Sequence, residues 1–159
     1  MEPIIVNNFE PIFISTLPET FMILQSAHFV VHPSVGKVVL HGSRGLAGNY
    51  KSESDIDLSL IIEFDANDPW IERESDLEEI FSTTYDHWRS LIEVDIAVIF
   101  ELHPCGLTCF NHSYWDKKNS CETITDCFGL YKNQKGSHGI ITNAGIRVDR
   151  MYPCLKIWQ

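Results

Sequence analysis

Two aspartates separated by one residue, Asp55 and Asp57, lie in the segment ESDIDLSLIIE, where polar and apolar residues alternate. The alternation predicts a strand over residues 55–63, and side chains two apart on a strand project from one face about 7 Å apart along the backbone. Two carboxylates this close repel each other unless one is protonated or a cation lies between them. Hard divalent cations prefer oxygen ligands, so the pair predicts a Mg²⁺ site.

A third aspartate, Asp95, lies in the segment IEVDIAVIF at residues 92–100. This segment predicts a strand in which Asp95 faces away from the apolar residues of the other parity. If the two predicted strands are neighbours in one sheet, Asp95 completes a three-carboxylate site for one or two Mg²⁺ ions. Taken singly, each residue has an alternative: Asp55 and Asp57 can be a polar strand face, and Asp95 can pair with an arginine.

The loop before Asp55 has the composition of a phosphate-binding segment. Gly42 and Ser43 directly follow a predicted strand at residues 37–41. A glycine there lets the backbone approach a ligand closely, and the Ser43 hydroxyl and successive N–H groups can bind phosphate oxygens. Arg44 and Lys51 are additional cationic candidates for the phosphates.

A competing phosphate motif is present in the same loop. The segment GLAGNYKS at residues 45–52 nearly fits the P-loop pattern, but Tyr50 occupies the position of the second glycine. A tyrosine obstructs the close backbone approach that a P-loop requires, and that scheme leaves the aspartate pair without a role. A true P-loop is therefore rejected.

The combined pattern resembles the polymerase-β-like nucleotidyltransferase superfamily, in particular its minimal members, which include antibiotic-modifying enzymes and antitoxins. The matching residues are LHGS at 40–43, eleven intervening residues, DIDL at 55–58, and Asp95 as the displaced third carboxylate. The resemblance covers about residues 36–100. It implies a mixed sheet flanked by helices.

For function, the resemblance implies that Gly42 and Ser43 hold a nucleoside triphosphate and that Asp55, Asp57 and Asp95 bind Mg²⁺. A hydroxyl of a small molecule or a protein would attack the α-phosphorus, and pyrophosphate would leave. Asp95 would bind the metal ion nearest the acceptor, either as a ligand alone or also as a base.

The chain also departs from the family pattern. Members usually carry a helical domain after the catalytic core, whereas residues 101–159 contain no long amphipathic helix signal. Three alternatives follow: a protein partner or second copy supplies that surface, the acceptor is small, or catalysis has been lost. In the last case the chain is an interaction module, such as an antitoxin-like partner of a small helical protein.

Two helices are expected around the predicted strands. One spans residues 17–31, with Pro18 in its first turn. The other spans residues 69–91, with Asp68 as its cap. Its apolar residues at helical spacing are Leu77, Ile80, Phe81, Thr84 and Trp88.

The alternation of helix and strand signals indicates an α/β or α+β fold with a mixed sheet. With 159 residues, 44% of them hydrophobic and 21% charged, the chain is expected to form a single domain. Its nucleotidyltransferase-like core is expected at about residues 17–100, and residues 101–159 form a short C-terminal extension.

Composition also limits the environment and the partners. The net charge of −10 argues against nucleic-acid binding, which depends on Lys and Arg. The N-terminus lacks a basic leader region and no apolar stretch is long enough to span a bilayer, so a cytoplasmic protein is expected. The five cysteines are expected to be reduced thiols and not a disulfide framework.

Residues 101–159 add two weaker candidates. Ligand types suited to zinc occur in this part, but without paired C-x-x-C units, so scattered buried thiols are the favoured reading. These residues are His103, Cys105, Cys109, His112, Cys121 and Cys127. The basic residues Lys132, Lys135, Arg147 and Arg150 can face the triphosphate or the acceptor, although surface charge explains each singly. A strand and turn, and then a last strand, are expected within residues 138–158.

Overall fold

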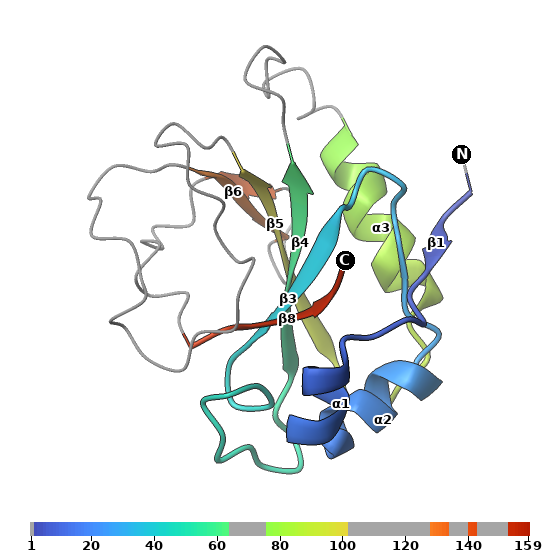
Figure 1. Cartoon of the computed structure of the whole chain (residues 1–159). Coiled ribbons are helices and arrows are strands. Elements are labelled where there is room, and N and C mark those ends of the chain that lie inside the picture. The colour runs from blue at the N-terminus through green and yellow to red at the C-terminus, as the bar shows by residue number, and fades with distance from the viewer. Residues whose placement is uncertain (1, 64–75, 102–127, 134–139, 143–152) are drawn as a thin grey trace.

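The computed structural model describes residues 2–63, 76–101, 128–133, 140–142 and 153–159. Eleven helices and strands lie in these ranges (Figure 1). In chain order they are β1 (Ile4–Ile5), α1 (Pro11–Thr16), α2 (Pro18–Ser26), β2 (Val30–Val31), β3 (Lys37–His41), β4 (Ile56–Glu63), α3 (Leu77–His87), β5 (Val94–Glu101), β6 (Phe128–Asn133), β7 (Ile140–Thr142) and β8 (Leu155–Trp158).

The main sheet has six strands in the order β7-β6-β5-β4-β3-β8. The β4–β5 pair is parallel, and β3–β4, β3–β8, β5–β6 and β6–β7 are antiparallel. Strands β1 and β2 form a separate antiparallel pair. The expectation of a mixed α and β fold built on a mixed sheet is therefore confirmed.

The described helices pack against one face of this sheet (Figure 1). Every second residue of the central strands faces these helices, as the alternation in the sequence predicts. The strand residues in this core include Val38, Leu40, Ile56, Leu58, Leu60, Ile62, Val94, Ile96, Val98 and Phe100. Phe13 of α1, Leu24 of α2, and Ile80 and Phe81 of α3 close the core from the other side.

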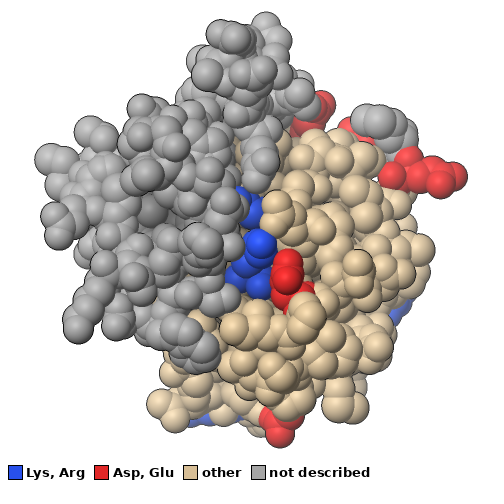
Figure 2. Space-filling view, viewed as in Figure 1, with Lys and Arg blue, Asp and Glu red and all other residues tan. Residues whose placement is uncertain are grey.

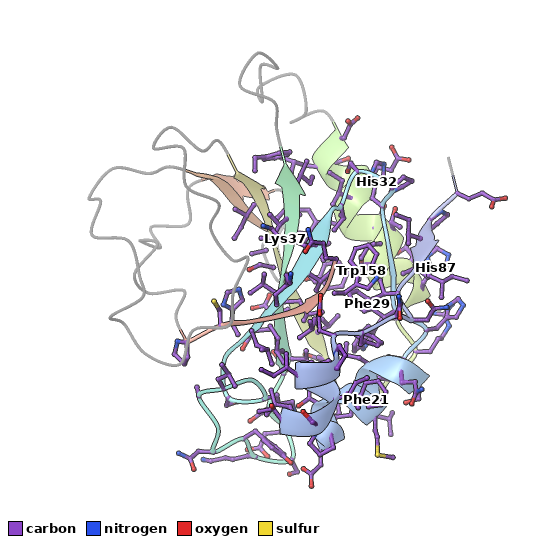
Figure 3. All side chains as sticks on the ribbon, viewed as in Figure 1. Phe21, Phe29, His32, Lys37, His87 and Trp158 are labelled. Carbon is purple, nitrogen blue, oxygen red and sulfur yellow. The ribbon has the colours of Figure 1, made fainter. Side chains whose placement is uncertain are left out.

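The opposite face of the central strands is also buried. Val39, Ile61 and Ile99 of β3, β4 and β5 are each 0% exposed. Lys37 shares this face and is also completely buried (Figure 3). The middle of the sheet therefore lies inside the protein on both faces, as is typical of sheets with parallel pairs.

The predicted helix over residues 17–31 is wrong in its last part. Helix α2 begins at Pro18, one residue later than predicted, and ends at Ser26, and His28 takes a left-handed φ of 57° that stops the helix. The following β-branched residues Val30 and Val31 pair with β1. Helix α1, which precedes Leu17, was not predicted.

The predicted helix over residues 69–91 is correct in its centre and wrong at its end. The described part, α3, ends at His87, and Trp88 is extended, with its indole N–H donating to the Ile92 carbonyl at 2.8 Å. Residues 69–75 and the predicted cap Asp68 lie outside the described residues. The predicted apolar face is confirmed: Leu77, Ile80, Phe81 and Thr84 are buried, and Trp88 packs against the core.

The predicted strands match the structure closely. The strand predicted over residues 37–41 is β3, and those predicted over 55–63 and 92–100 begin one and two residues later, as β4 and β5. In the C-terminal part, β7 and β8 lie within the range where strands were expected. Strand β6 was not predicted.

Figure 2 shows the charged side chains on one face of the molecule. There the described acidic side chains are scattered, and the described Lys and Arg side chains form a small central patch beside acidic groups. The described part of this face lacks the broad basic surface that nucleic-acid binding requires. No helix in the described ranges has the length and apolar character needed to cross a bilayer.

Phe9, Phe13 and Phe21 form an aromatic cluster in the core at helices α1 and α2, and substitutions there test the packing. The ring centroid of Phe13 lies 5.7 Å from that of Phe9 and 6.0 Å from that of Phe21. Because Phe13 is completely buried, Phe13→Ala should lower the free energy of unfolding by about 3–5 kcal/mol in urea titrations. Ile12→Ala on the same helix removes a side chain that is 44% exposed, and should cost about 0.5 kcal/mol. Equal losses would contradict the packing.

Candidate nucleotide and metal site

The strand register places Asp57 of β4 directly beside Asp95 of β5. The strands are parallel neighbours, so the two backbones are separated by only about 4.8 Å at this level. Both side chains lie on the face opposite the helices, because Ile56, Leu58 and Ile96 occupy the helix-facing positions. The structure therefore brings together two of the three predicted carboxylates.

His41, the last residue of β3, extends this row. It lies opposite Asp57 in the antiparallel β3–β4 pair and so shares the face of the two aspartates. Its Nε2 lies 2.7 Å from the hydroxyl oxygen of Ser59, which is 1% exposed. The row across the sheet is therefore His41, Asp57, Asp95. The sequence signal for this position is the alternation along β3, which places His41 on the same face as Lys37 and Val39.

Asp55, the third predicted carboxylate, lies one residue before β4 begins and is half-buried. Within the described ranges, no three His, Cys, Asp or Glu side chains are gathered as a metal-binding group. Mg²⁺ commonly takes only one or two protein carboxylates and completes its octahedron with water and substrate phosphates. The pair formed by Asp57 and Asp95 fits that mode of binding.

Gly42 is in direct contact with Asp57, one member of this carboxylate pair. Its φ is +73°, and a Cβ placed on it would collide with Oδ2 of Asp57 and lie 3.1 Å from the Asp57 Cγ. Any other residue at this position would displace the aspartate and strain the backbone. The glycine of the Gly-Ser pair therefore packs against the second aspartate of the Asp55–Asp57 motif.

The loop between β3 and β4 is built from successive tight turns. The Gly45 N–H donates to the Gly42 carbonyl at 3.0 Å, and the Gly48 N–H donates to the Gly45 carbonyl at 3.3 Å. Thr20 of α2 holds the loop from the helix side, because its buried hydroxyl donates to the Arg44 carbonyl at 2.7 Å. The start of the loop is thus fixed against the helices.

Arg44 organises the loop from within. Its side chain is 4% exposed, and its guanidinium donates to the carbonyls of Ser54 at 2.6 Å, Lys51 at 3.1 Å and Ser52 at 3.2 Å. It also stacks on the Tyr50 ring, 4.6 Å from the ring centroid. The fork geometry of the guanidinium suits this arrangement, in which one side chain ties together the far end of the loop.

The remaining loop candidates are more open to solvent. Lys51 is exposed, and its backbone N–H donates to the Ser54 hydroxyl at 2.8 Å. Ser43 is half-buried and follows Gly42 at the end of β3. Lys51 therefore has the exposure expected of a phosphate-binding cation, whereas the charge of Arg44 is already directed at loop carbonyls.

Helix α3 supports the strand that carries Asp95. The Ile96 N–H donates to the hydroxyl oxygen of Tyr85 at 3.1 Å, at a level where β6 does not pair with β5. On the other side, the Ile56 N–H donates to the Glu93 carbonyl at 2.9 Å. These two bonds hold the beginning of β5 at the level of Asp57.

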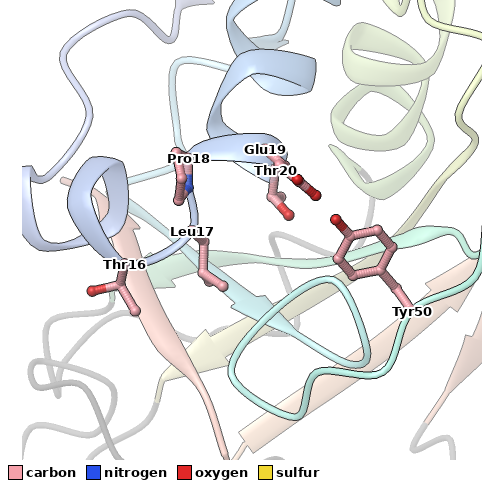
Figure 4. A pocket seen from close by; sticks show the side chains of 6 residues that line it. All are labelled: Thr16, Leu17, Pro18, Glu19, Thr20 and Tyr50. Carbon is pink, nitrogen blue, oxygen red and sulfur yellow. The ribbon is translucent and has the colours of Figure 1, made fainter.

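A small hollow of about 270 Å³ lies between the loop and the junction of α1 and α2. It is lined by Thr16, Leu17, Pro18, Glu19, Thr20 and Tyr50, and the polar ends of Glu19, Thr20 and Tyr50 point toward one another (Figure 4). Sites for whole cofactors occupy about 300–1,000 Å³, so this hollow is too small for a complete nucleoside triphosphate.

Most of the candidates beyond residue 101 fall outside the described residues. This applies to the six His and Cys residues considered as zinc ligands, and to Lys135, Arg147 and Arg150. Lys132 lies in β6, paired with Ala97 of β5. Cys154, within the described residues, is buried and is not part of a disulfide.

Comparisons of the chain with protein-family models, curated proteins and solved structures found no match.

Substitutions at two glycines with the same φ distinguish the cost of backbone strain from the cost of the contact with Asp57. Gly42 and Gly48 both have a φ of +73°, but a Cβ at Gly48 would meet nothing within 4 Å. Gly48→Ala should therefore cost about 1 kcal/mol of unfolding free energy through strain alone. Gly42→Ala should cost about 1–3 kcal/mol more, because it also displaces Asp57.

A double-mutant cycle checks the cause of that difference. Adding Asp57→Ala to Gly42→Ala removes the colliding carboxylate, so the excess cost of Gly42→Ala should shrink in the double variant. Additive costs would show that the two residues do not press on each other.

Arg44 and Lys51 should respond differently to substitution. Arg44→Lys leaves several loop carbonyls without donors and should lower the free energy of unfolding by about 2–3 kcal/mol. Lys51→Gln should leave stability unchanged, since its side chain is exposed. Chemical denaturation of both variants provides the comparison, and an unaffected Arg44→Lys protein would contradict the structural role of Arg44.

Proposed function

We propose that this chain is a Mg²⁺-dependent nucleotidyltransferase that moves a nucleoside monophosphate from a nucleoside triphosphate to a hydroxyl group. The observation that carries the proposal is the contact between Gly42 and Asp57, with Asp95 beside Asp57 on the next strand. This contact places the glycine-containing turn after β3 beside a pair of carboxylates at one end of the sheet. Both features belong to the sequence pattern of the polymerase-β-like nucleotidyltransferases.

In this reaction the carboxylates would act through bound Mg²⁺. Asp57 and Asp95 would bind a Mg²⁺ ion between them, and Asp55 would bind the same ion or a second one carried by the triphosphate. Metal ions in such sites stabilise the attacking and leaving oxygens of an in-line displacement. Asp95 would lie nearest the acceptor hydroxyl, and pyrophosphate would leave from the opposite side.

The loop would hold the triphosphate. The backbone at Gly42 and the hydroxyl and N–H of Ser43 would donate hydrogen bonds to phosphate oxygens. Lys51, which is exposed, would add charge-assisted bonds, while Arg44 would keep the loop in shape through its carbonyl contacts. The acceptor would be a small molecule or a protein side chain, bound with or without help from a protein partner or a second copy of the chain.

The test is calorimetric titration with non-hydrolysable ATP, GTP, CTP and UTP analogues, with and without Mg²⁺. One nucleotide should bind in a Mg²⁺-dependent manner, and Asp57→Asn should weaken that binding by at least about 100-fold while the protein remains folded. Asp86→Asn is the matched control, because it removes the same charge from an exposed position on α3 and should leave binding unchanged.

The possible outcomes of this titration distinguish the enzyme from the alternative function. Binding that survives Asp57→Asn would show that the carboxylate pair is not the metal site. A complete absence of binding to all four analogues would overturn the enzyme proposal and favour the alternative function, an interaction module such as an antitoxin-like partner of a small helical protein.

A further inference from the structure

Two histidines that are distant in the sequence meet on the surface of the helical layer. The ring centroids of His28 and His87 are 6.0 Å apart, with 40° between the ring planes. His28 is exposed. His87, which is labelled in Figure 3, is half-buried at the end of α3. The pair lies outside the row of His41, Asp57 and Asp95, so the proposed nucleotidyl transfer makes no use of it.

His28 occupies a position that another residue would fill at lower cost. Helix α2 ends at Ser26, Ala27 caps it, and His28 follows with a left-handed φ of 57°. Glycine is the usual residue at this point of a helix end because it has no Cβ to strain the left-handed backbone, and asparagine, aspartate and histidine are tolerated there more often than other side chains. The imidazole is therefore present at a position that backbone conformation alone would assign to glycine.

His87 is oriented by a hydrogen bond of its own helix. Its Nδ1 lies 2.7 Å from the Thr83 carbonyl oxygen, and a carbonyl only accepts, so Nδ1 carries the hydrogen. In the neutral ring the lone pair is then on Nε2. A hydrogen bond from the second ring nitrogen to a carbonyl is the usual way in which proteins orient histidines that bind metal ions.

The two segments that carry the rings are tied together. The Arg89 N–H, two residues after His87, donates to the Ala27 carbonyl, one residue before His28, at 2.7 Å. The buried Thr84 hydroxyl of α3 donates to the Val30 carbonyl at 2.9 Å. The separation of the rings is therefore set by the fold and not only by side-chain rotation.

We propose that His28 and His87 form a binding site for a first-row transition-metal ion of the zinc type. With Zn–N bonds of about 2.0–2.1 Å and tetrahedral angles, two imidazoles on one ion have ring centroids about 5 Å apart. The observed separation of 6.0 Å is about 1 Å longer, so zinc binding requires the two rings to move closer together by that amount. Water would complete the coordination, since the described residues offer no third His, Cys, Asp or Glu side chain to such a group.

The site exists only in the folded chain, because the end of α2 and the end of α3 come together through folding. An ion that binds both rings therefore stabilises the native state in proportion to its concentration. It would also fix the end of α3, the helix whose Tyr85 hydroxyl binds the Ile96 N–H. Zinc would thus act as a structural ligand of the helical layer, distinct from Mg²⁺ at the carboxylate pair.

Thermal unfolding with and without ZnCl₂, on chelator-treated protein, tests the proposal. At a free zinc concentration about 100 times the dissociation constant, the melting temperature of the unaltered chain should rise by roughly 5 °C or more. His28→Asn keeps a residue that tolerates the left-handed backbone, and should abolish this rise without lowering the melting temperature in the absence of zinc. His87→Gln should abolish the rise as well.

His28→Gly makes the test sharper, because its two expected effects have opposite signs. Without zinc, its melting temperature should exceed that of the unaltered chain, since backbone strain is relieved. With zinc, the metal-dependent rise should be lost. A zinc-dependent rise that persists in His28→Asn, or no rise in the unaltered chain, would overturn the site.

Histidine-ring NMR resonances give a second measurement that does not depend on variants folding. Zinc should shift the resonances of both His28 and His87 with one common affinity. Shifts confined to other histidines, or to neither of these two, would also overturn the site, because zinc would then bind elsewhere in the chain.

Discussion

The parallel pairing of β4 with β5 is the constraint on which the candidate site depends. These two strands are the only parallel pair among the described strands, and the register aligns Asp57 with Asp95. Parallel strands cannot be joined by a tight turn, and α3 lies in the chain between them and packs against β5. Because side chains alternate along a strand, a shift of one residue in this register would send Asp95 into the apolar layer under the helices.

The same alternation explains why much of this region could be predicted from sequence. Polar and apolar residues alternate over residues 56–60, and every second residue of 94–100 is large and apolar, so the strands and the facing of their aspartates follow directly, although Ile61 and Ile99 are apolar residues of the aspartate parity. Pairing between strands is less accessible, because it depends on long-range packing. The placement of Asp95 beside Asp57 was therefore only a conditional expectation, which the register satisfies.

The end of helix α2 and the direction of the Arg44 side chain have no signal in the local sequence. Apolar residues recur through residues 17–31 without a glycine or a second proline to end a helix, and nothing in the histidine at position 28 marks a left-handed stop, since glycine usually has that role. Arg44 was assigned to phosphate on charge alone. Its inward direction is determined by loop carbonyls whose positions exist only after the loop has folded. Residue types and spacings can be read from a sequence, but the direction of a long side chain such as that of Arg44 depends on the folded structure.

The Ile96 N–H of β5 is hydrogen-bonded to the Tyr85 hydroxyl of helix α3, so its protection from solvent depends on that helix. An amide within a sheet ladder is normally released to solvent only when a neighbouring strand detaches. Here the partner belongs to a helix, so a brief undocking of α3 would expose the amide while the ladder between β4 and β5 stays intact. Backbone hydrogen exchange beside Asp95 would thus follow the motions of the helical layer and not the opening of the sheet.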